Sequence, residues 1–353
     1  MINSFYSTTD FNIPKGFHAI EVGAVTRLTD QSVQISFLIP DPLCENFRFK
    51  PGQNIDIILL KNGHQIRRTY SICSSQVEPL SIAVKAIPNG EVSPFINTSV
   101  TKGSVLLISE PKGSFLLNEG AQKIVLIGAG SGITPLFAII KSAIKKGIQT
   151  TLIYGNRLSS STMFKNELSE IKELQKFYFF SGEKIEEHFW GRIDKNGIQK
   201  VVALEQSIKT ADAYYVCGPG SMIKEVKSVL MEMGIHSDKI NSEYFEALPS
   251  ENTIANNKAQ CNAHVTVRLD GEKYNYFIGY ENSDLLEASI KAGLDAPFSC
   301  KTGVCGSCRA KVIIGGAIMK SNYALTNDEV SDGYILTCQA LPSTPTITIS
   351  YDE

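Results

Sequence analysis

The sequence has no long hydrophobic run and little net charge. The 353 residues contain no run of 18 or more apolar residues, which excludes a transmembrane helix. The net charge of −2 gives no reason to expect a nucleic acid or an anionic membrane as partner. The segment from Met1 to Gly16 is polar and lacks the basic and apolar regions of a signal peptide, so we expect a cytoplasmic protein.

Histidine is scarce, and the cysteines do not form a disulfide pattern. The five histidines are dispersed, so the sequence contains no evident set of histidines and carboxylates for activating oxygen. Four of the eight cysteines are scattered, and they are Cys44, Cys73, Cys217 and Cys261. This cysteine usage fits a reducing compartment.

The other four cysteines lie near the C-terminus with a distinctive spacing. Cys300, Cys305 and Cys308 follow the pattern C-x4-C-x2-C, and Cys338 is a distant fourth. This is the ligand pattern of plant-type [2Fe–2S] clusters. The alternatives are a structural zinc, which usually uses two short C-x2-C pairs, or disulfides in a secreted domain. Only one short pair is present, so the sequence predicts a [2Fe–2S] cluster held by these four cysteines.

The length and the changes of pattern predict a multidomain protein. Up to about Phe115, short alternating segments such as 32–39, 54–60 and 80–87 are separated by proline and glycine, which indicates an antiparallel β-barrel or sandwich. From Lys123, apolar strand segments alternate with helical patterns such as 135–146 and 221–233, which indicates an α/β domain with a parallel sheet. The predicted domains are 1–118, 119–248 and 263–353, with a linker at 249–262.

A glycine-rich turn follows the first strand of the α/β domain. The strand Ile124–Ile127 leads into residues 128–135, of which we expect Gly128, Gly130, Gly132, Thr134 and Pro135 to contact a dinucleotide. Glycines let the backbone approach a pyrophosphate, and a helix N-terminus offers it free N–H groups. A tight turn without a ligand is the alternative for such a loop on its own.

Two further loops of this domain complete the predicted crevice. Arg157 follows the next strand, where an acidic residue would indicate NADH; its guanidinium suits a 2′-phosphate, so the sequence favours NADPH over NADH. A later strand ends in Cys217-Gly218-Pro219, and we expect this turn to border the same crevice. Arg157 and Cys217 each have an alternative interpretation without a ligand. An exposed arginine often only increases solubility, and a lone cysteine is often a buried residue of the core.

One segment of the first domain combines a cation, an aromatic ring and hydroxyls. In the segment Arg67–Ile72, strand alternation predicts Arg68 and Tyr70 on one face and Thr69 and Ser71 on the other. Arginine suits a phosphate, a tyrosine ring suits an isoalloxazine, and a hydroxyl can bond a flavin nitrogen. Taken alone, this pattern is better explained by an edge strand with surface polar residues, and only the context of the other motifs favours the flavin.

Taken together, these motifs resemble the ferredoxin–NADP reductase superfamily, in particular members with a C-terminal plant-type ferredoxin domain. Arg68-x-Tyr70-Ser71 and Gly90-Glu91-Val92-Ser93 resemble its flavin-binding segments, residues 128–135 its glycine loop, and Cys217-Gly218-Pro219 its turn under the nicotinamide. Glu243-Tyr244-Phe245 falls where such proteins keep an acidic-aromatic end to the nucleotide domain. The resemblance runs from about Phe17 to Tyr351 and is nearest to the reductase components of phenylacetyl-CoA epoxidases, followed by those of ketosteroid hydroxylases.

The resemblance implies a flavin β-barrel, a nucleotide domain and a β-grasp-like ferredoxin domain. It implies FAD, with FMN as the alternative, and makes Ser71 and Cys217 the catalytic candidates. The other residues that we expect to contact the flavin or the nucleotide are Arg68, Thr69, Tyr70, Lys85, Gly90, Val92, Ser93, Gly218, Pro219 and Phe245.

The implied activity is transfer of electrons from NADPH, or NADH, through FAD and the cluster to a partner oxygenase of the phenylacetyl-CoA epoxidase kind. Alternative acceptors are a Rieske or ketosteroid oxygenase, a flavodoxin or a hybrid-cluster protein. The alternative to an electron-transfer enzyme is a redox-sensing protein that binds the same cofactors but turns over slowly.

Overall fold

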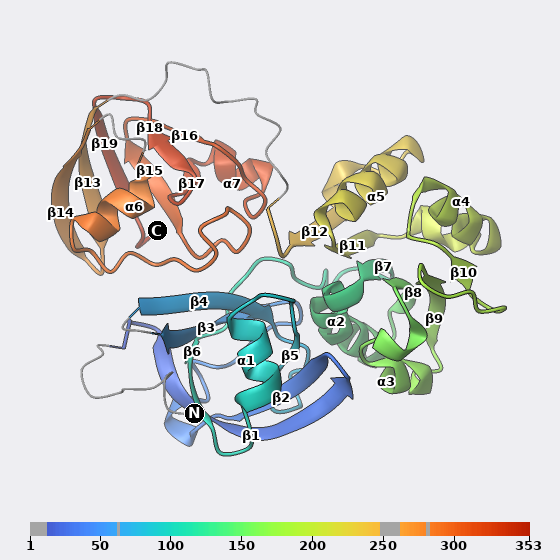
Figure 1. Ribbon diagram of the computed structural model, residues 1–353. Helices are drawn as coiled ribbons and strands as arrows, with labels where there is room; N and C mark the ends of the chain where they lie inside the picture. Colours follow the sequence, from blue (N-terminus) through green and yellow to red (C-terminus); the bar gives the residue numbers. More distant parts are fainter. Residues whose placement is uncertain (1–12, 62–63, 248–261, 280–282) are drawn as a thin grey trace. The chain divides into compact units, whose positions relative to one another are not determined.

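The computed structural model in Figure 1 describes residues 13–61, 64–247, 262–279 and 283–353. The chain divides into two compact units, Met1–Glu243 and Tyr244–Glu353. All but Asn262 of the predicted linker lies outside the described residues, as does Cys261. We describe each unit by itself.

The first sheet of the N-terminal unit is antiparallel and has six strands in the order β4-β3-β6-β1-β2-β5. The predicted segments 32–39, 54–60 and 80–87 correspond to β2, β3 and β5. Branched side chains such as Ile20, Ile35 and Ile57 alternate into its core. Its elements are β1 (Phe17–Thr29), β2 (Ser32–Leu38), η1 (Asp41–Leu43), β3 (Asn54–Lys61), β4 (His64–Ser71), β5 (Ser81–Lys85), α1 (Val92–Ser99) and β6 (Val105–Ser109).

The second sheet of this unit has the order β10-β9-β8-β7-β11-β12, and the strands from β10 to β11 pair in parallel. Figure 1 shows α2 and α3 on one face and α4 and α5 on the other. The strands are β7 (Lys123–Ala129), β8 (Gln149–Asn156), β9 (Leu174–Phe180), β10 (Phe189–Trp190), β11 (Ala213–Gly218) and β12 (Ile240–Tyr244). The helices are η2 (Gly130–Gly132), α2 (Ile133–Lys145), η3 (Ser159–Ser161), α3 (Lys165–Glu170), α4 (Lys195–Leu204), η4 (Gln206–Thr210), α5 (Gly220–Glu232) and η5 (Ser237–Lys239).

The two sheets of the N-terminal unit share buried contacts. Cys73, Ala83 and Phe115, from the part of the chain that forms the first sheet, join the same apolar core as α2 and the strands β7 and β8. The Phe115 and Tyr215 rings meet edge to face, 5.6 Å between centroids. The amide of Asn118 also donates to the Tyr215 hydroxyl at 2.7 Å. These contacts fix the end of β4 relative to the end of β11.

The C-terminal unit contains a five-stranded sheet in the order β14-β13-β19-β15-β17 and a two-stranded sheet of β16 and β18. The Asp270-Gly271 pair predicts a hairpin, which is confirmed, since both residues have positive φ and join β13 to β14. Its elements are β13 (Ala263–Leu269), β14 (Glu272–Ile278), α6 (Leu285–Lys291), β15 (Arg309–Ile314), β16 (Ala317–Met319), α7 (Asn327–Ser331), β17 (Tyr334–Leu336), β18 (Ala340–Pro342) and β19 (Thr346–Ser350).

The start of α6 lies where the sequence predicts a helix. The pattern after the polar pair Asn282-Ser283 predicts a helix, and α6 begins with Asp284 as its N-cap, whose carboxylate accepts the Glu287 N–H at 2.8 Å. A carboxylate is favoured there because it also faces the positive end of the helix dipole. Asn282 itself lies outside the described residues.

Candidate functional site

The four C-terminal cysteines lie together as two pairs. Cys300 is hydrogen-bonded to Cys305, and Cys308 to Cys338. Within the described residues, no three His, Cys, Asp or Glu side chains form a group that could hold a metal ion. A tetrahedral zinc would need four ligands around one point. Two separate thiol pairs instead fit two irons, each held by two cysteines, so the donor set suits a [2Fe–2S] cluster.

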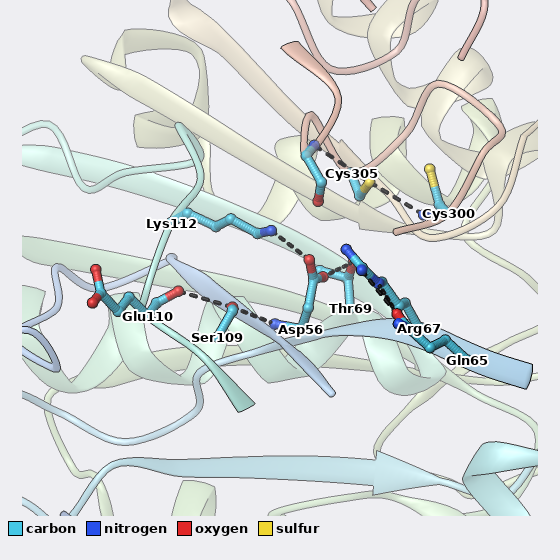
Figure 2. A network of polar contacts seen from close by, with 10 residues as sticks. Asp56, Gln65, Arg67, Thr69, Ser109, Glu110, Lys112, Cys300 and Cys305 are labelled. Carbon is cyan, nitrogen blue, oxygen red and sulfur yellow. Dashed lines mark hydrogen bonds and ion pairs between the residues drawn. The ribbon is translucent and has the colours of Figure 1, made fainter. Parts of the chain in front are cut away.

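The loop around these cysteines turns its backbone toward the sulfurs. The N–H groups of Cys300 and Ser307 point to Cys305 Sγ at 3.4 and 3.5 Å, and that of Thr302 points to Cys300 Sγ at 3.3 Å. Figure 2 labels Cys300 and Cys305 in this loop. Lys301 adopts positive φ, as do Gly303 and Gly306. N–H groups directed at sulfur stabilise negative charge on thiolates and tune a cluster that they bind.

The thiols of each pair differ in acidity because one donates to the other. The bond with Cys305 outweighs burial and lowers the pKa of Cys300 to about 5. The bond between Cys308 and Cys338 raises the pKa of Cys308, and burial raises it further. The same bond lowers the pKa of Cys338, although burial opposes this shift. One thiol of each pair therefore has a lowered pKa, which favours the thiolate form that binds iron.

A chain of hydroxyls supports the buried side of the cluster loop. Thr337 Oγ1 donates to the carbonyl oxygen of Cys308 at 3.0 Å, and the Tyr351 hydroxyl donates to Thr337 Oγ1 at 2.9 Å. Thr337 is fully buried, and burial is the main reason that the pKa of Tyr351 is raised. These hydroxyls therefore stay neutral and hold the Cys308 peptide in one orientation.

The predicted flavin strand is β4, and its two faces have different surroundings. Tyr70 is half-buried, and burial raises its pKa, while Arg68 is exposed and donates from Nη1 to its neighbour's carbonyl at 2.8 Å. Thr69 donates to Asp56 Oδ1 at 2.6 Å, and Asp56 is fully buried and ion-paired with Lys112 (Figure 2). The Thr69 side chain thus anchors β4 to the interior of its own sheet.

The second predicted flavin segment forms the turn that begins α1. Ser93 Oγ accepts the N–H of Ile87 at 3.1 Å, and both Val92 and Ser93 are buried. Gly90 is exposed, and its N–H donates to the Ile87 carbonyl at 3.0 Å. Lys85 is half-buried at the end of β5. The side chains of Val92 and Ser93 therefore stabilise this turn, which leaves the backbone of the turn and Lys85 as the groups that could meet a ligand.

Ser71 and Cys217 both lie near one carboxyl group, that of Glu243, which the sequence did not single out. We call the place where these three residues meet the crevice, because α/β sheets bind their ligands beyond the carboxyl ends of the strands. Ser71 Oγ donates to Glu243 Oε2 at 3.1 Å across 172 residues of sequence. Burial raises the pKa of Glu243 to about 7, although hydrogen bonds from Ser71 and Asn54 oppose the shift. Cys217 is fully buried, and burial, with the nearby Glu243 charge, raises its pKa well above the usual range. The crevice thus joins a neutral thiol to a carboxyl that titrates near neutrality.

The glycine loop packs directly against the Cys217 turn. A Cβ at Gly132 would lie 2.1 Å from the Cys217 carbonyl oxygen, so only glycine fits there. Gly130 has φ +56°, and its carbonyl accepts the Tyr154 hydroxyl at 2.9 Å. Thr134 Oγ1 donates to the Ser131 carbonyl at 3.0 Å, and no side chain caps α2. The first N–H groups of α2 are therefore not used by a side-chain cap, which suits an anionic ligand.

The remaining predicted residues have different surroundings. Arg157 is exposed at the end of β8, next to the serine turn η3. Gly218 has φ +155° before Pro219, which precedes α5. Phe245 follows β12, is 42% exposed and belongs to the C-terminal unit.

The sequence reasoning missed three residues that contact the predicted sites. Glu243 was noticed only as part of the family-like end of the nucleotide domain, and its contact with Ser71 depends on tertiary structure. Asn54 pairs with Ser71 in the β3–β4 register. Glu183, after β9, accepts the N–H of Ser159. Isolated Glu and Asn residues give no motif, so no sequence signal singled them out.

Comparisons with known proteins support the three-part arrangement. Residues 20–116 match the model of oxidoreductase FAD-binding domains, residues 126–228 that of oxidoreductase NAD-binding domains, and residues 268–343 that of 2Fe-2S iron-sulfur cluster binding domains. Among the described residues, every helix is too short or too polar for a membrane span.

Several relatives match along nearly their whole length. The chain is 35% identical to a 1,2-phenylacetyl-CoA epoxidase component of Escherichia coli, over 95% of this chain and 98% of that protein. It is 28% identical to the ferredoxin reductase component of 3-ketosteroid-9-alpha-monooxygenase from Mycobacterium tuberculosis, over 96% and 98%. Phthalate dioxygenase reductase shares the fold, with a TM-score of 0.59 and 23% identity over 95% of this chain and 98% of that chain. The protein therefore belongs to the ferredoxin–NADP reductase superfamily, in the family of FAD-, NAD- and [2Fe–2S]-binding reductases that includes this 1,2-phenylacetyl-CoA epoxidase component.

Proposed function

We propose that this reductase passes electrons from NADPH to a partner oxygenase of the phenylacetyl-CoA epoxidase kind. When bound, the flavin accepts two electrons as a hydride and releases them singly, and the cluster carries one electron at a time. The observation that carries this proposal is the arrangement of four thiols in two pairs, because it supplies a one-electron carrier. The partner is inferred from the name of the 35% identical relative.

The chain's own residues bind and orient the reactants. Arg68 binds flavin phosphate, Tyr70 holds the isoalloxazine plane, and Ser71 donates a hydrogen bond near the reacting flavin nitrogen. Glu243 keeps its proton up to about neutral pH and can hold it at the crevice. Cys217 lines the nicotinamide side, where its neutral thiol adds no charge. Correct orientation is the main contribution a protein makes to such a transfer.

The same proposal includes the finer architecture. An isolated bridge between Ile72 and Ile82 links the ends of β4 and β5, the two edge strands of the first sheet, which supports a closed flavin barrel. The mixed sheet around α6 supports a β-grasp-like ferredoxin domain. We place the domains at 1–118, 119–248 and 263–353.

Anaerobic titration with NADPH tests the electron path. The purified holoprotein should lose its flavin absorbance and then develop the paramagnetic resonance signal of a reduced cluster. Addition of the oxygenase component of a phenylacetyl-CoA epoxidase should give NADPH-dependent product. Cluster reduction without product would leave the reductase intact and point to another acceptor, such as a Rieske or ketosteroid oxygenase. No flavin reduction by either NADPH or NADH would contradict the proposal.

The coenzyme assignment has its own test. Arg157→Ala should lower the ratio of kcat/KM for NADPH to that for NADH, because the guanidinium is the group proposed to bind the 2′-phosphate. Arg192→Ala serves as a matched control, because Arg192 is, like Arg157, an exposed arginine, and it lies beyond β10 in the same domain. An unchanged ratio in Arg157→Ala would refute the role of Arg157.

A further inference from the structure

Two loops meet at the carboxyl ends of the neighbouring strands β8 and β9. The β8 loop contains Arg157 and the serine turn η3, and the β9 loop contains Gly182 and Glu183. The Glu183 carboxylate accepts the N–H of Ser159, the first residue of η3. Ligands of parallel α/β sheets bind beyond the carboxyl ends of the strands. A carboxylate is therefore bound to the turn that follows Arg157, the residue that we expect to contact the 2′-position of the adenosine ribose.

Close packing holds the β9 loop in this position. Gly182 donates its N–H to the Arg157 carbonyl at 2.8 Å. A Cβ at Gly182 would lie 2.8 Å from that carbonyl oxygen and 2.9 Å from Arg157 Cγ, so a larger residue would push the loops apart. The absence of a side chain at residue 182 is what brings Glu183 within reach of Ser159.

The turn carries charges of both signs. Lys165 Nζ donates to Ser159 Oγ at 2.5 Å, so Ser159 contacts a cation through its hydroxyl and an anion through its amide. Arg157 adds a second, exposed cation two residues before Ser159. Arg157 and Lys165 favour a 2′-phosphate, which carries nearly two negative charges, whereas Glu183 repels it.

We propose that Glu183 is a specificity-determining residue that accepts the ribose 2′-hydroxyl of NADH and weakens the binding of the 2′-phosphate of NADPH. The inference rests on the proposed function, since it concerns the coenzyme that this site reads. A carboxylate that bonds the 2′-hydroxyl normally comes from the end of the second strand of a dinucleotide fold. Here Arg157 follows that strand, and the next strand supplies the carboxylate. The enzyme therefore accepts both coenzymes, with a preference set by Arg157 and Lys165 against Glu183.

Glu183→Gln tests this assignment, because glutamine keeps an oxygen that can accept the Ser159 N–H but removes the charge. The ratio of kcat/KM for NADPH to that for NADH should rise about 5- to 10-fold, the range expected for removing one like charge at a partly exposed site. The affinity for 2′,5′-ADP should rise by a similar factor, while that for 5′-ADP should not. Added salt should reduce the difference between wild type and variant.

Two further variants separate charge from other effects. Glu187→Gln removes an exposed carboxylate from the same loop and should leave the ratio unchanged. Glu183→Asp keeps the charge and should retain most of the wild-type ratio. The proposal is overturned if the ratio changes less than twofold in Glu183→Gln, or if Glu187→Gln or Glu183→Asp raises it equally.

The binding titrations keep this inference distinct from the proposed electron path. The 2′,5′-ADP measurement needs no flavin reduction, so it reports on Glu183 even if neither NADPH nor NADH reduces the flavin. Flavin reduction with a 2′,5′-ADP affinity that does not respond to Glu183→Gln would instead remove the specificity role alone.

Discussion

The cluster loop and the Ser71–Glu243–Cys217 crevice are assembled in opposite ways. Three of the four paired cysteines lie within the nine residues from Cys300 to Cys308, so a local loop brings most of that site together. The crevice joins the ends of β4, β11 and β12, and its Ser71–Glu243 bond spans 172 residues. The first site depends on local backbone conformation, and the second depends on the packing of two sheets.

This difference determines where each site is vulnerable. In the cluster loop, loss of one ligand should remove the site and leave the rest of the chain in place. In the crevice, the residues are held by close backbone contact, so a single methyl group at the wrong place should disturb several of them. Four variants test this contrast, beginning with the largest expected effect.

Cys305→Ser should abolish one-electron output, because Cys305 is one of the paired thiols and also the sulfur that accepts the N–H groups of Cys300 and Ser307. NADPH should still bleach the flavin, as measured by stopped-flow absorbance. Cys44→Ser, at an exposed cysteine, is the matched control. Loss of flavin binding together with the cluster would mean that the loop is not a separate local site.

Gly132→Ala should disrupt the nucleotide crevice, because the added Cβ would lie 2.1 Å from a backbone carbonyl oxygen that cannot rotate away. We expect a loss of about 2–3 kcal/mol in the free energy of unfolding and a larger relative loss in coenzyme affinity. Chemical denaturation and nucleotide titration measure the two effects. Gly120→Ala, where the nearest atom is a side-chain oxygen 3.5 Å away, should have little effect.

Glu243→Gln should change how stability depends on pH. The pKa of Glu243 is raised from 4.5 to about 7, so the folded state holds its proton more tightly than the unfolded state. Stability from this group is therefore fully present below about pH 4.5 and is lost as the pH rises to about 7. The variant should gain up to about 3 kcal/mol relative to wild type across that range. The free energy of unfolding of wild type and variant, measured at pH 5 and pH 8, checks this expectation. An equal change in both proteins between the two pH values would contradict it.

Tyr351→Phe should have the smallest effect of the four. It removes the hydroxyl that donates to Thr337 and leaves the ring in place, at a cost of about 1 kcal/mol in unfolding free energy. The midpoint potential of the cluster should also shift, because Thr337 donates to the carbonyl of Cys308, one of the four proposed ligands. Tyr274→Phe, which removes a hydroxyl that donates to the exposed Glu272 of the same unit, should not shift the potential. An equal shift in both variants would rule out the relay.

The element order could be predicted from sequence to a large extent. The segments 54–60 and 124–127 correspond to β3 and β7, and the helix expected at 135–146 corresponds to α2. Alternating or continuous apolar runs identify such elements because each strand or helix must bury one side or both. The exact cap of α6 could not be predicted, since three polar residues in succession, Asn282, Ser283 and Asp284, all suit a cap.

The sequence by itself determined the ligand spacing of Cys300, Cys305 and Cys308, the glycine loop and the order of the domains. These features are local: each requires particular residue types at short separations, and the backbone conformation follows from them. Only the tertiary structure decided that Glu243 meets Ser71, that Gly132 must lie against Cys217, and that Glu183 binds the serine turn beside Arg157. Such contacts form where strands that are distant in sequence end at the same edge of packed sheets. No short sequence motif predicts which residues meet there.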